Sequence, residues 1–334
     1  MGCNNCLTND TEEIYNFKRT NGLFRFINES GECYINSFLQ ILLHNTLFLN
    51  VINSIEIKNE KMQLINELLN IIKKSQNEDI FLNPTKIKDI MISLDDSYHN
   101  NGGDLNILIS DFINELSTEL PKSEKYSIKF PEDEITKNAL NKLIKKFYSK
   151  KNSEFTKIFY GNTLIEYTCK NSHLINAKFM IFITINLSIY PFINKDIICV
   201  EEILENNFKI RNTDRIKYCE ICKEEVLIDE AEYIYNLPNI IILYFPRIYD
   251  EKYYNNKIKF TKDLDFKNYL KKKDYDNPIY HLFGVIQNIH GHFNSATINN
   301  FDNNWYFFND LDEPLLKNIE EIYKLNPIAL FYSK

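Results

Sequence analysis

Cys33 lies where a polar turn gives way to a helix. Residues 28–31 are Asn-Glu-Ser-Gly, a composition typical of turns, and they show no apolar periodicity. After the cysteine, apolar side chains recur at helical spacing: Ile35, Phe38, Leu39, Ile41 and Leu42. A buried helix should therefore begin at Cys33. Because the positive end of a helix favours a thiolate, Cys33 is either a reactive nucleophile or a small buried apolar residue, and this segment supports both interpretations equally.

The composition is that of a folded globular protein. The chain has 334 residues, of which 44% are hydrophobic and 14% aromatic, which provides an ample core and excludes disorder. A net charge of −7 argues against a nucleic-acid partner, because a nucleic-acid surface would show as a basic excess. No apolar run reaches the roughly 18 residues of a membrane span. The longest run, at 178–185, is short and rich in β-branched and aromatic residues, which predicts a strand.

The cysteine content predicts a reducing compartment. Seven cysteines at irregular spacing do not suit a disulfide framework, and we expect no signal peptide, so the cytosol or nucleus is the expected location. Gly2 and the adjacent Cys3 permit lipidation and hence membrane association, but Cys6 stands where the myristoylation motif has Ser or Thr. A frayed polar tail is the expected alternative.

A thiolate nucleophile requires a general base and a group that orients the base. His290 and His292 stand together at a Gly-containing turn between two predicted strands, where a side chain is rigidly held yet exposed. After the aromatic run at 305–308 come Asn309 and Asp310, either of which can accept the imidazole N–H and fix its tautomer. Cysteine, then histidine, then asparagine is the order of papain-like peptidases, but the interval before the histidine is much longer here. A segment must therefore be inserted in that interval.

Two segments resemble the motifs of the ubiquitin-specific proteases. Residues 28–40 resemble their cysteine box, Asn-x-Gly-Asn-Thr-Cys-Tyr-x-Asn-Ser-x-x-Gln, and residues 280–310 resemble their histidine box, Gly-His-Tyr followed by Trp-x-x-Phe-Asn-Asp. Further matches lie between the boxes in the family's order, at 103–105, 158–161, 237–247 and 257–270. The resemblance implies an α+β fold of the papain-like, ubiquitin-specific-protease type, with a helical thumb, a β palm and inserted β fingers.

Carried over residue by residue, the resemblance assigns the catalytic roles. It makes Cys33 the nucleophile, His292 the general base and Asn309 the orienting group, with Asp310 as a possible substitute. It makes Asn28 a side-chain donor to the oxyanion hole. The implied activity is deubiquitination, the hydrolysis of the isopeptide or peptide bond after the C-terminal glycine of ubiquitin through an acyl-enzyme, without a catalytic cofactor.

The chain also departs from the family's motifs. Asp104 matches a substrate-binding acid, but Ile107 stands where the family has Glu, which removes one acidic contact to the basic tail of ubiquitin. Glu32 is expected to raise the pKa of the neighbouring thiol and to attenuate activity. The loop at 288–291 is shortened, and Phe293 replaces Tyr. Because all catalytic residue types are present we expect an active enzyme; the alternatives are a weak or inactive ubiquitin-binding pseudo-protease and a peptidase for another ubiquitin-like modifier.

The remaining cysteines suggest a structural metal. Cys219 and Cys222 form a Cys-x-x-Cys pair, which is half of a zinc site. Family members with zinc carry a second such pair earlier, where this chain has Cys169, then Ser172 in the second ligand position, then His173. We predict one structural Zn²⁺ held by these three cysteines and His173. Fingers that have lost their metal are the alternative.

The resemblance also divides the chain. A tail at 1–16 would precede one catalytic domain at 17–334, with a thumb over about 17–145, fingers over about 150–235 and a palm over about 236–334. The fingers are expected to grip ubiquitin and not to catalyse. We expect a monomer whose partners are ubiquitin and ubiquitinated proteins, with no nucleic acid. Cys199, in an apolar run, is expected to be a core residue.

Overall fold

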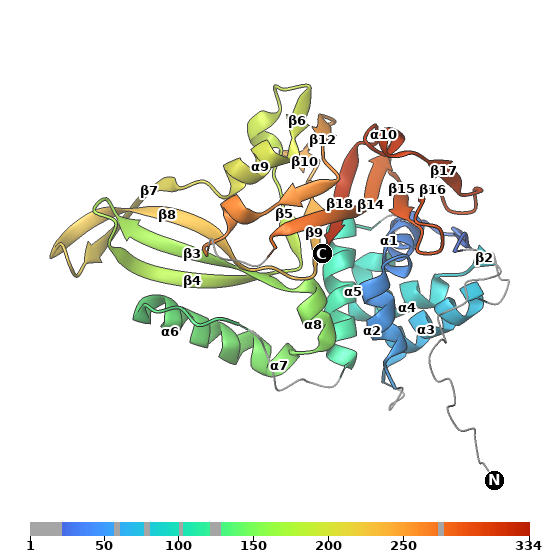
Figure 1. Cartoon of the computed structure of the whole chain (residues 1–334), viewed down its shortest axis with the longest axis horizontal. Helices are drawn as coiled ribbons and strands as arrows, with labels where there is room; N and C mark the ends of the chain where they lie inside the picture. Colours follow the sequence, from blue (N-terminus) through green and yellow to red (C-terminus); the bar gives the residue numbers. More distant parts are fainter. Residues whose placement is uncertain (1–21, 57–60, 77–80, 100–102, 121–127, 273–276) are drawn as a thin grey trace, which may run out of the picture.

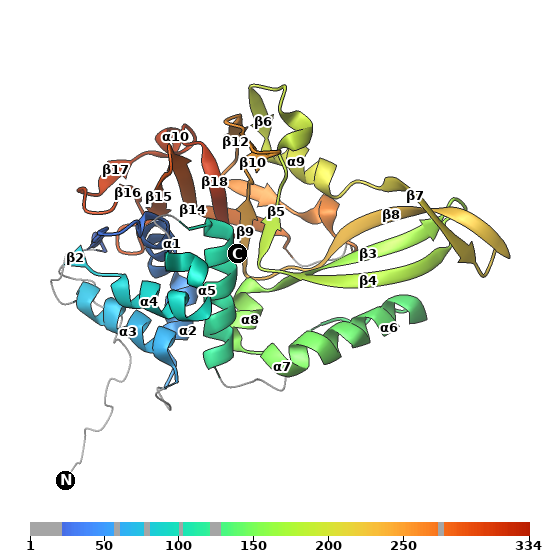
Figure 2. The same cartoon turned by 180° about the vertical axis from the view of Figure 1, so that it is seen from behind.

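The computed structural model describes residues 22–56, 61–76, 81–99, 103–120, 128–272 and 277–334. Figure 1 shows three parts: a group of helices from the first half of the chain, a sheet formed mainly by the C-terminal part, and an elongated sheet that extends away from both. The view from behind shows a helix running alongside the elongated sheet (Figure 2). The predicted tail at 1–16 lies outside the described residues.

Most helices precede residue 160 and most strands follow it. The α-helices are α1 (Cys33–Leu43), α2 (Thr46–Asn53), α3 (Gln63–Gln76), α4 (Thr85–Leu94), α5 (Leu105–Glu119), α6 (Glu134–Leu143), α7 (Ser149–Lys151), α8 (Glu154–Phe159), α9 (Val200–Asn207) and α10 (Ile319–Ile322). The strands are β1 (Arg25–Phe26), β2 (Phe81–Leu82), β3 (Gly161–Cys169), β4 (Leu174–Phe182), β5 (Thr184–Asn186), β6 (Ile197–Cys199), β7 (Arg211–Cys219), β8 (Glu224–Asn236), β9 (Ile240–Tyr244), β10 (Ile248–Tyr249), β11 (Lys252–Tyr253), β12 (Lys257–Lys259), β13 (Asp263–Asp265), β14 (Ile279–Ile289), β15 (His292–Ile298), β16 (Trp305–Phe308), β17 (Leu315–Lys317) and β18 (Pro327–Ser333).

Helix α1 is the buried helix predicted to begin at Cys33. Every residue of α1 is buried. Phe38 packs edge-on against Phe112 of α5, with ring centroids 5.4 Å apart, and its ring lies 6.2 Å from that of Phe331 on β18. The helix is thus enclosed between the other helices and the C-terminal sheet, which explains why apolar residues occur around much of its circumference. The predicted helix is confirmed.

The C-terminal sheet, here called the palm sheet, contains eight strands. Its order is β17-β16-β15-β14-β18-β9-β5, with β13 paired to β14. The hairpin of β14 and β15 ends with Ile289 opposite His292. On the other side of β15, Ser295 lies opposite Phe308 of β16. The antiparallel register therefore brings the end of β16 toward the start of β15, where the predicted histidine and asparagine stand.

The elongated sheet, here called the finger sheet, has the order β4-β3-β8-β7. One face packs on α6: Ala139 and Leu140 of the helix join Leu164, Phe179 and Tyr235 of the sheet in one apolar cluster. Because side chains alternate between the two faces of a strand, their neighbours along each strand point to the opposite face. That opposite face is one wall of a cavity described below.

Two expectations about apolar segments need correction. The run at 178–185 is strand, as predicted, but it is shared between two sheets: β4 ends at Phe182 in the finger sheet and β5 begins at Thr184 in the palm sheet. Cys199, expected in the core, is only half-buried, because it lies at the end of the short strand β6 and caps α9. Within the described residues no single helix has the length and apolar composition of a membrane span; α1 and α2 meet that test only together, and they are bent by 85°.

Candidate active site

Cys33 is the first residue of α1 and is 6% exposed. Burial raises the pKa of its thiol above the ordinary value, and the negative charge of Asp310 raises it further, while the backbone N–H of Phe293 donates to the sulfur and opposes both effects. Burial and the charge of Asp310 therefore outweigh the thiolate-favouring effect expected from the start of the helix. Ionisation of Cys33 requires a base.

A tight hairpin holds His292 at the first position of β15. The pairing of β14 and β15 continues to Ile289 and His292, so only His290 and Gly291 form the turn. Both residues have left-handed backbone angles, with φ of 52° and 89°, as a type I′ hairpin turn requires. Glycine adopts this conformation without steric cost. The shortened loop seen in the sequence is thus a turn that fixes His292 on the sheet.

Asn309 orients the imidazole of His292. The Nε2 atom of His292 lies 2.6 Å from Oδ1 of Asn309, and the side-chain N–H of Asn309 donates to Asp312 Oδ2 at 2.5 Å. Because the amide nitrogen donates to Asp312, the amide oxygen faces the ring and accepts a hydrogen bond from the Nε2–H group. The neutral imidazole then carries its lone pair on Nδ1, the nitrogen free to accept a proton.

The thiol and the imidazole lie in one corner of the molecule. The sulfur of Cys33 accepts a hydrogen bond from the backbone N–H of Phe293, the residue directly after His292. The ring of Tyr34, next to Cys33, lies 6.3 Å from the ring of Phe293. Segments far apart in the sequence, at the start of α1 and the start of β15, therefore assemble what we call the catalytic corner, a nucleophile beside an oriented base.

Asp310 is positioned differently from the expected substitute for Asn309. Its Oδ2 lies 3.7 Å from His292 Nε2, farther than Asn309. Its two carboxylate oxygens instead accept side-chain amides, from Asn28 at 2.7 Å and from Asn36 at 2.8 Å. Its backbone is left-handed, with φ of 47°. The geometry favours Asn309 as the partner of the imidazole and gives Asp310 the task of holding two asparagines.

The turn before Cys33 fixes the Asn28 amide. The backbone N–H of Glu32 donates to Asn28 Oδ1 at 2.8 Å, so the Asn28 amide nitrogen points toward Asp310. An amide nitrogen has two N–H donors. Asn28 can therefore hold Asp310 with one donor and offer the other to a substrate oxygen.

Glu32 does not act on the thiol in the way that the sequence suggested. Its carboxylate accepts the backbone N–H groups of Glu29 at 2.9 Å and Ser30 at 2.7 Å, and it pairs with Lys88 Nζ at 3.0 Å. Although burial alone would raise the pKa of Glu32, hydrogen bonds from Ser30 and Lys88 lower it to about 2. The charged group that raises the pKa of Cys33 is Asp310. The expected attenuation by Glu32 thus has no support, because Lys88 neutralises its charge.

Asp104, predicted to bind substrate, is the N-cap of α5. Its Oδ1 accepts the backbone N–H groups of Asn106 at 2.7 Å and Ile107 at 3.1 Å. The side chain is exposed, as is that of Ile107. Asp104 therefore stabilises the start of α5 and still presents a carboxylate to solvent.

The predicted metal ligands meet where two hairpins end. Cys169 ends β3 and His173 precedes β4, while Cys219 ends β7 and Cys222 precedes β8. One donor atom from each of these four residues lies within 4.8 Å of the others. Ser172, at the position of the missing cysteine, adopts the left-handed φ of 61° at the turn, and His173 supplies the donor instead. This cluster, here called the finger-tip cluster, could hold a metal ion.

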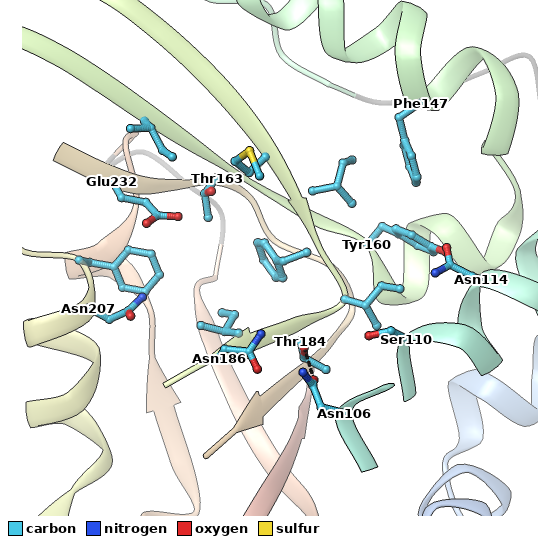
Figure 3. Close-up of a pocket in the computed structure, with 17 residues that line it drawn as sticks. Asn106, Ser110, Asn114, Phe147, Tyr160, Thr163, Thr184, Asn186, Asn207 and Glu232 are labelled. Carbon is cyan, nitrogen blue, oxygen red and sulfur yellow. Dashed lines mark hydrogen bonds between the residues drawn. The ribbon is translucent and has the colours of Figure 1, made fainter. Parts of the chain in front are cut away.

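A cavity of about 630 Å³ lies between the palm and finger sheets (Figure 3). The helices α5 and α9 also contribute to its wall. Asn106 on α5 accepts the Thr184 hydroxyl at 2.7 Å, and Tyr160 donates to Asn114 at 2.8 Å. Ile165, Met180 and Glu232 line it from the finger-sheet face opposite α6. The cavity is thus open to a ligand that contacts both sheets.

The sequence did not identify several residues that complete the corner. Asn36 donates to Asp310 and to the backbone carbonyl of Ile27, and it lies one helical turn after the cysteine, a spacing that could have suggested a shared face. Lys88 and Asp312 carry no local signal, because each is brought to its partner by the tertiary fold.

The family model for ubiquitin carboxyl-terminal hydrolases matches residues 24–332. Ubiquitin carboxyl-terminal hydrolase 12 of Saccharomyces cerevisiae is 30% identical over 103 residues, which are 28% of this chain and 8% of that protein. Ubiquitin carboxyl-terminal hydrolase 9 of Arabidopsis thaliana is 28% identical over 130 residues, which are 36% of this chain and 14% of that protein. The matches thus span only a small part of these relatives' own length.

Solved structures show the same fold. The SAGA DUB module Ubp8/Sgf11/Sus1/Sgf73 bound to monoubiquitin contains a chain that superimposes with a TM-score of 0.73 at 18% identity, covering 94% of this chain and 70% of that one. The module bound to ubiquitin aldehyde gives a TM-score of 0.72 at 20% identity, again covering 94% of this chain and 70% of that one. The predicted α+β, papain-like fold is confirmed.

Proposed function

The chain belongs to the ubiquitin carboxyl-terminal hydrolase family, and from that membership we propose that it is a cysteine-type deubiquitinase, which cleaves the bond after the C-terminal glycine of ubiquitin. The observation that carries the proposal is the His292–Asn309 contact of 2.6 Å beside a buried thiol whose pKa is raised. A thiol of this kind needs a base, and an oriented imidazole is that base.

The proposed reaction uses the residues of the corner in turn. His292 Nδ1 accepts the proton of Cys33, and the thiolate attacks the carbonyl carbon of the glycine. Asn28 and backbone N–H groups near Cys33 donate to the oxyanion. The C–N bond breaks as His292 protonates the leaving amine, which leaves a thioester on Cys33. Water then gives a proton to His292 and attacks the thioester, and the departing sulfur takes that proton back.

The body of ubiquitin is proposed to lie on the finger-sheet face opposite α6. This face carries the exposed side chain of Met180 and borders the cavity between the two sheets. The cavity has room for a few side chains of a partner, so most of the contact would lie on the open face around it. Asp104 and the palm sheet would then guide the C-terminal tail toward Cys33, since Asp104 presents a carboxylate at the start of α5.

The metal of the finger-tip cluster is proposed to be a structural zinc ion. Tetrahedral zinc with ordinary bond lengths separates two sulfurs by about 3.8 Å and a sulfur from a nitrogen by about 3.5 Å. The Cys169 and Cys222 sulfurs are 3.9 Å apart, and His173 Nδ1 lies 3.5 Å from Cys169 and 3.3 Å from Cys222. The residues therefore fit Cys₃His coordination, and the ion would join the two hairpins.

A ubiquitin probe with a C-terminal electrophile tests the activity. The wild-type protein should form one covalent adduct and should release the fluorophore from a fluorogenic ubiquitin amide, whereas Cys33→Ala should do neither. An adduct that persists in Cys33→Ala, or a wild-type protein that forms none, would refute the assignment. Ubiquitin binding without turnover would indicate the pseudo-protease instead, an alternative that the intact corner does not favour.

Substrate identity needs a separate measurement. Probes built on other ubiquitin-like modifiers, used beside the ubiquitin probe, distinguish a deubiquitinase from a peptidase for one of those modifiers. A faster reaction with another modifier would overturn ubiquitin as the substrate while leaving the chemistry of Cys33 intact. The division into thumb, fingers and palm, a monomeric state, a cytosolic or nuclear location and the lack of a nucleic-acid partner remain predictions from the sequence.

A further inference from the structure

We propose that the buried ion pair of Lys88 and Glu32 locks the turn between Asn28 and Cys33, which makes Lys88 and Glu32 positioning residues for catalysis. The catalytic consequence rests on the proposed function, whereas the lock itself is a property of the turn. Neither residue is one that the cysteine box specifies. Glu32 departs from that box, and Lys88 lies on α4, away from the catalytic corner in sequence.

Each charged atom of Lys88 and Glu32 has hydrogen-bond partners. Lys88 Nζ donates to Glu32 Oε1 at 3.0 Å, to the Ser30 carbonyl oxygen at 2.7 Å and to Ser30 Oγ at 3.0 Å, which uses its three donors. Glu32 Oε2 accepts two backbone N–H groups, from Glu29 and Ser30, and Oε1 also accepts the Ser30 hydroxyl. The side chains of Lys88 and Glu32 are 8% and 3% exposed. A buried network this complete holds one geometry.

The lock reaches the proposed oxyanion donor through the backbone. The N–H of Glu32 donates to Asn28 Oδ1, and this contact turns the amide nitrogen of Asn28 toward the corner. Gly31, with a left-handed φ of 82°, allows the tight turn that brings the Glu32 N–H to the Asn28 side chain. Lys88 donates hydrogen bonds to both Ser30 and Glu32. The turn that orients Asn28 therefore cannot open without breaking the buried ion pair of Lys88 and Glu32. A donor stabilises an oxyanion only if it is in place before the charge develops.

A purely structural pair would behave differently from a positioning pair. A structural pair anchors α4, so its loss would lower the melting temperature and leave kcat per active site unchanged. Loss of a positioning pair also lowers kcat, with little effect on KM for ubiquitin. Removing only the cation leaves an uncompensated carboxylate next to Cys33, which raises the pKa of the thiol and moves the acid limb of the pH–rate profile upward.

The test compares Lys88→Met with Lys86→Met, a lysine of the same helix whose side chain is 75% exposed. Active sites are titrated with the ubiquitin electrophile, and kcat and KM are then measured from pH 5 to pH 9. Hydrogen exchange of the peptide over residues 28–33 reports on the turn without any substrate. We expect K88M to lower kcat about 10- to 100-fold, the range typical of a misplaced catalytic group. We also expect faster exchange in K88M and an acid limb at higher pH, with K86M like wild type.

The double variant Glu32→Gln with Lys88→Met supplies the second measurement. It removes both charges, so it should fold even if K88M does not. Its acid limb should match wild type, while its kcat should lie between those of wild type and K88M. The proposal would be overturned if K88M, or the double variant, had the same hydrogen exchange and kcat as K86M. It would also be overturned if K88M had a lower melting temperature with an unchanged kcat. If wild type fails to react with the ubiquitin electrophile, the proposed function fails, whereas the lock is then judged on exchange alone.

Discussion

The catalytic corner lies on elements embedded in the protein's core, whereas the finger-tip cluster lies at the ends of hairpins with little core around them. Every residue of α1 is buried, and the palm strands beside it are largely buried too. In contrast, β7 is exposed along almost its whole length. Packing can therefore hold Cys33 and His292 in place, but it cannot hold Cys219 and Cys222. The zinc ion that we propose there would supply this missing stabilisation, as a metal does in other small elements.

The difference predicts that defects at the corner change kcat and that defects at the finger tip change KM. The largest effect should come from His292→Ala, which removes the imidazole that Asn309 orients in the catalytic corner. We expect kcat/KM for a fluorogenic ubiquitin amide to fall by about 10³-fold or more. The melting temperature should change little, because the His292 side chain is 42% exposed.

His281→Ala is the matched control for the base. His281 lies on β14 and its ring contacts Asp263 at 2.6 Å, with both side chains more than half exposed. An exposed pair of this kind contributes little, so the control should keep wild-type kinetics. Equal losses in the two variants would show that the sheet, and not the imidazole at position 292, controls the rate.

The next largest effect is expected from Asn28→Ala. Loss of one oxyanion donor typically lowers kcat by about 10²–10³-fold. Asn36→Ala is the comparison for this prediction. Asn36 also donates to Asp310, at 2.8 Å, but it lies within α1, one turn after Cys33, and is not a proposed oxyanion donor. The fall in kcat should be smaller for N36A than for N28A, with KM unchanged in both. A larger loss in N36A would assign the main effect to support of Asp310.

The buried carboxylate of Glu32 makes the stability of the corner depend on pH. Its pKa is lowered from 4.5 to about 2 in the folded protein, so its contribution is complete above pH 4.5 and is lost as the pH falls toward 2. Between pH 5.5 and pH 3 the wild-type free energy of unfolding should fall by about 2 kcal/mol more than that of Glu32→Gln. Urea unfolding at the two pH values measures the difference. Parallel pH dependence in the two proteins would contradict the buried pairing.

The two regions also differ in how much of each could be predicted from the sequence. Periodicity placed Cys33 at the start of a helix and the candidate histidines at a turn between strands, and the family resemblance then selected Cys33, His292 and Asn309. The orientation of Glu32 could not be predicted, since it depends on Lys88, a partner on another helix. The sequence predicted a raised pKa for Cys33 but assigned it to Glu32, because the actual causes, burial and the charge of Asp310, are tertiary effects. At the finger tip, in contrast, Cys219 and Cys222 were predicted from their local spacing, and Cys169 and His173 from the family resemblance.

The smallest effect on the chemical step should come from the finger-tip cluster. Cys222→Ser, or removal of zinc with a chelator, should raise KM for ubiquitin about tenfold, since contacts with one part of the partner are lost, and should leave kcat nearly unchanged. Cys199→Ser is the matched control, because Cys199 is a half-buried thiol outside the cluster and should bind neither metal nor substrate. Metal analysis should find one zinc per chain in wild type and C199S, and none in C222S. A fall in kcat as large as that of N28A would mean that the finger tip supports the catalytic corner directly, which would break the division of tasks between the two regions.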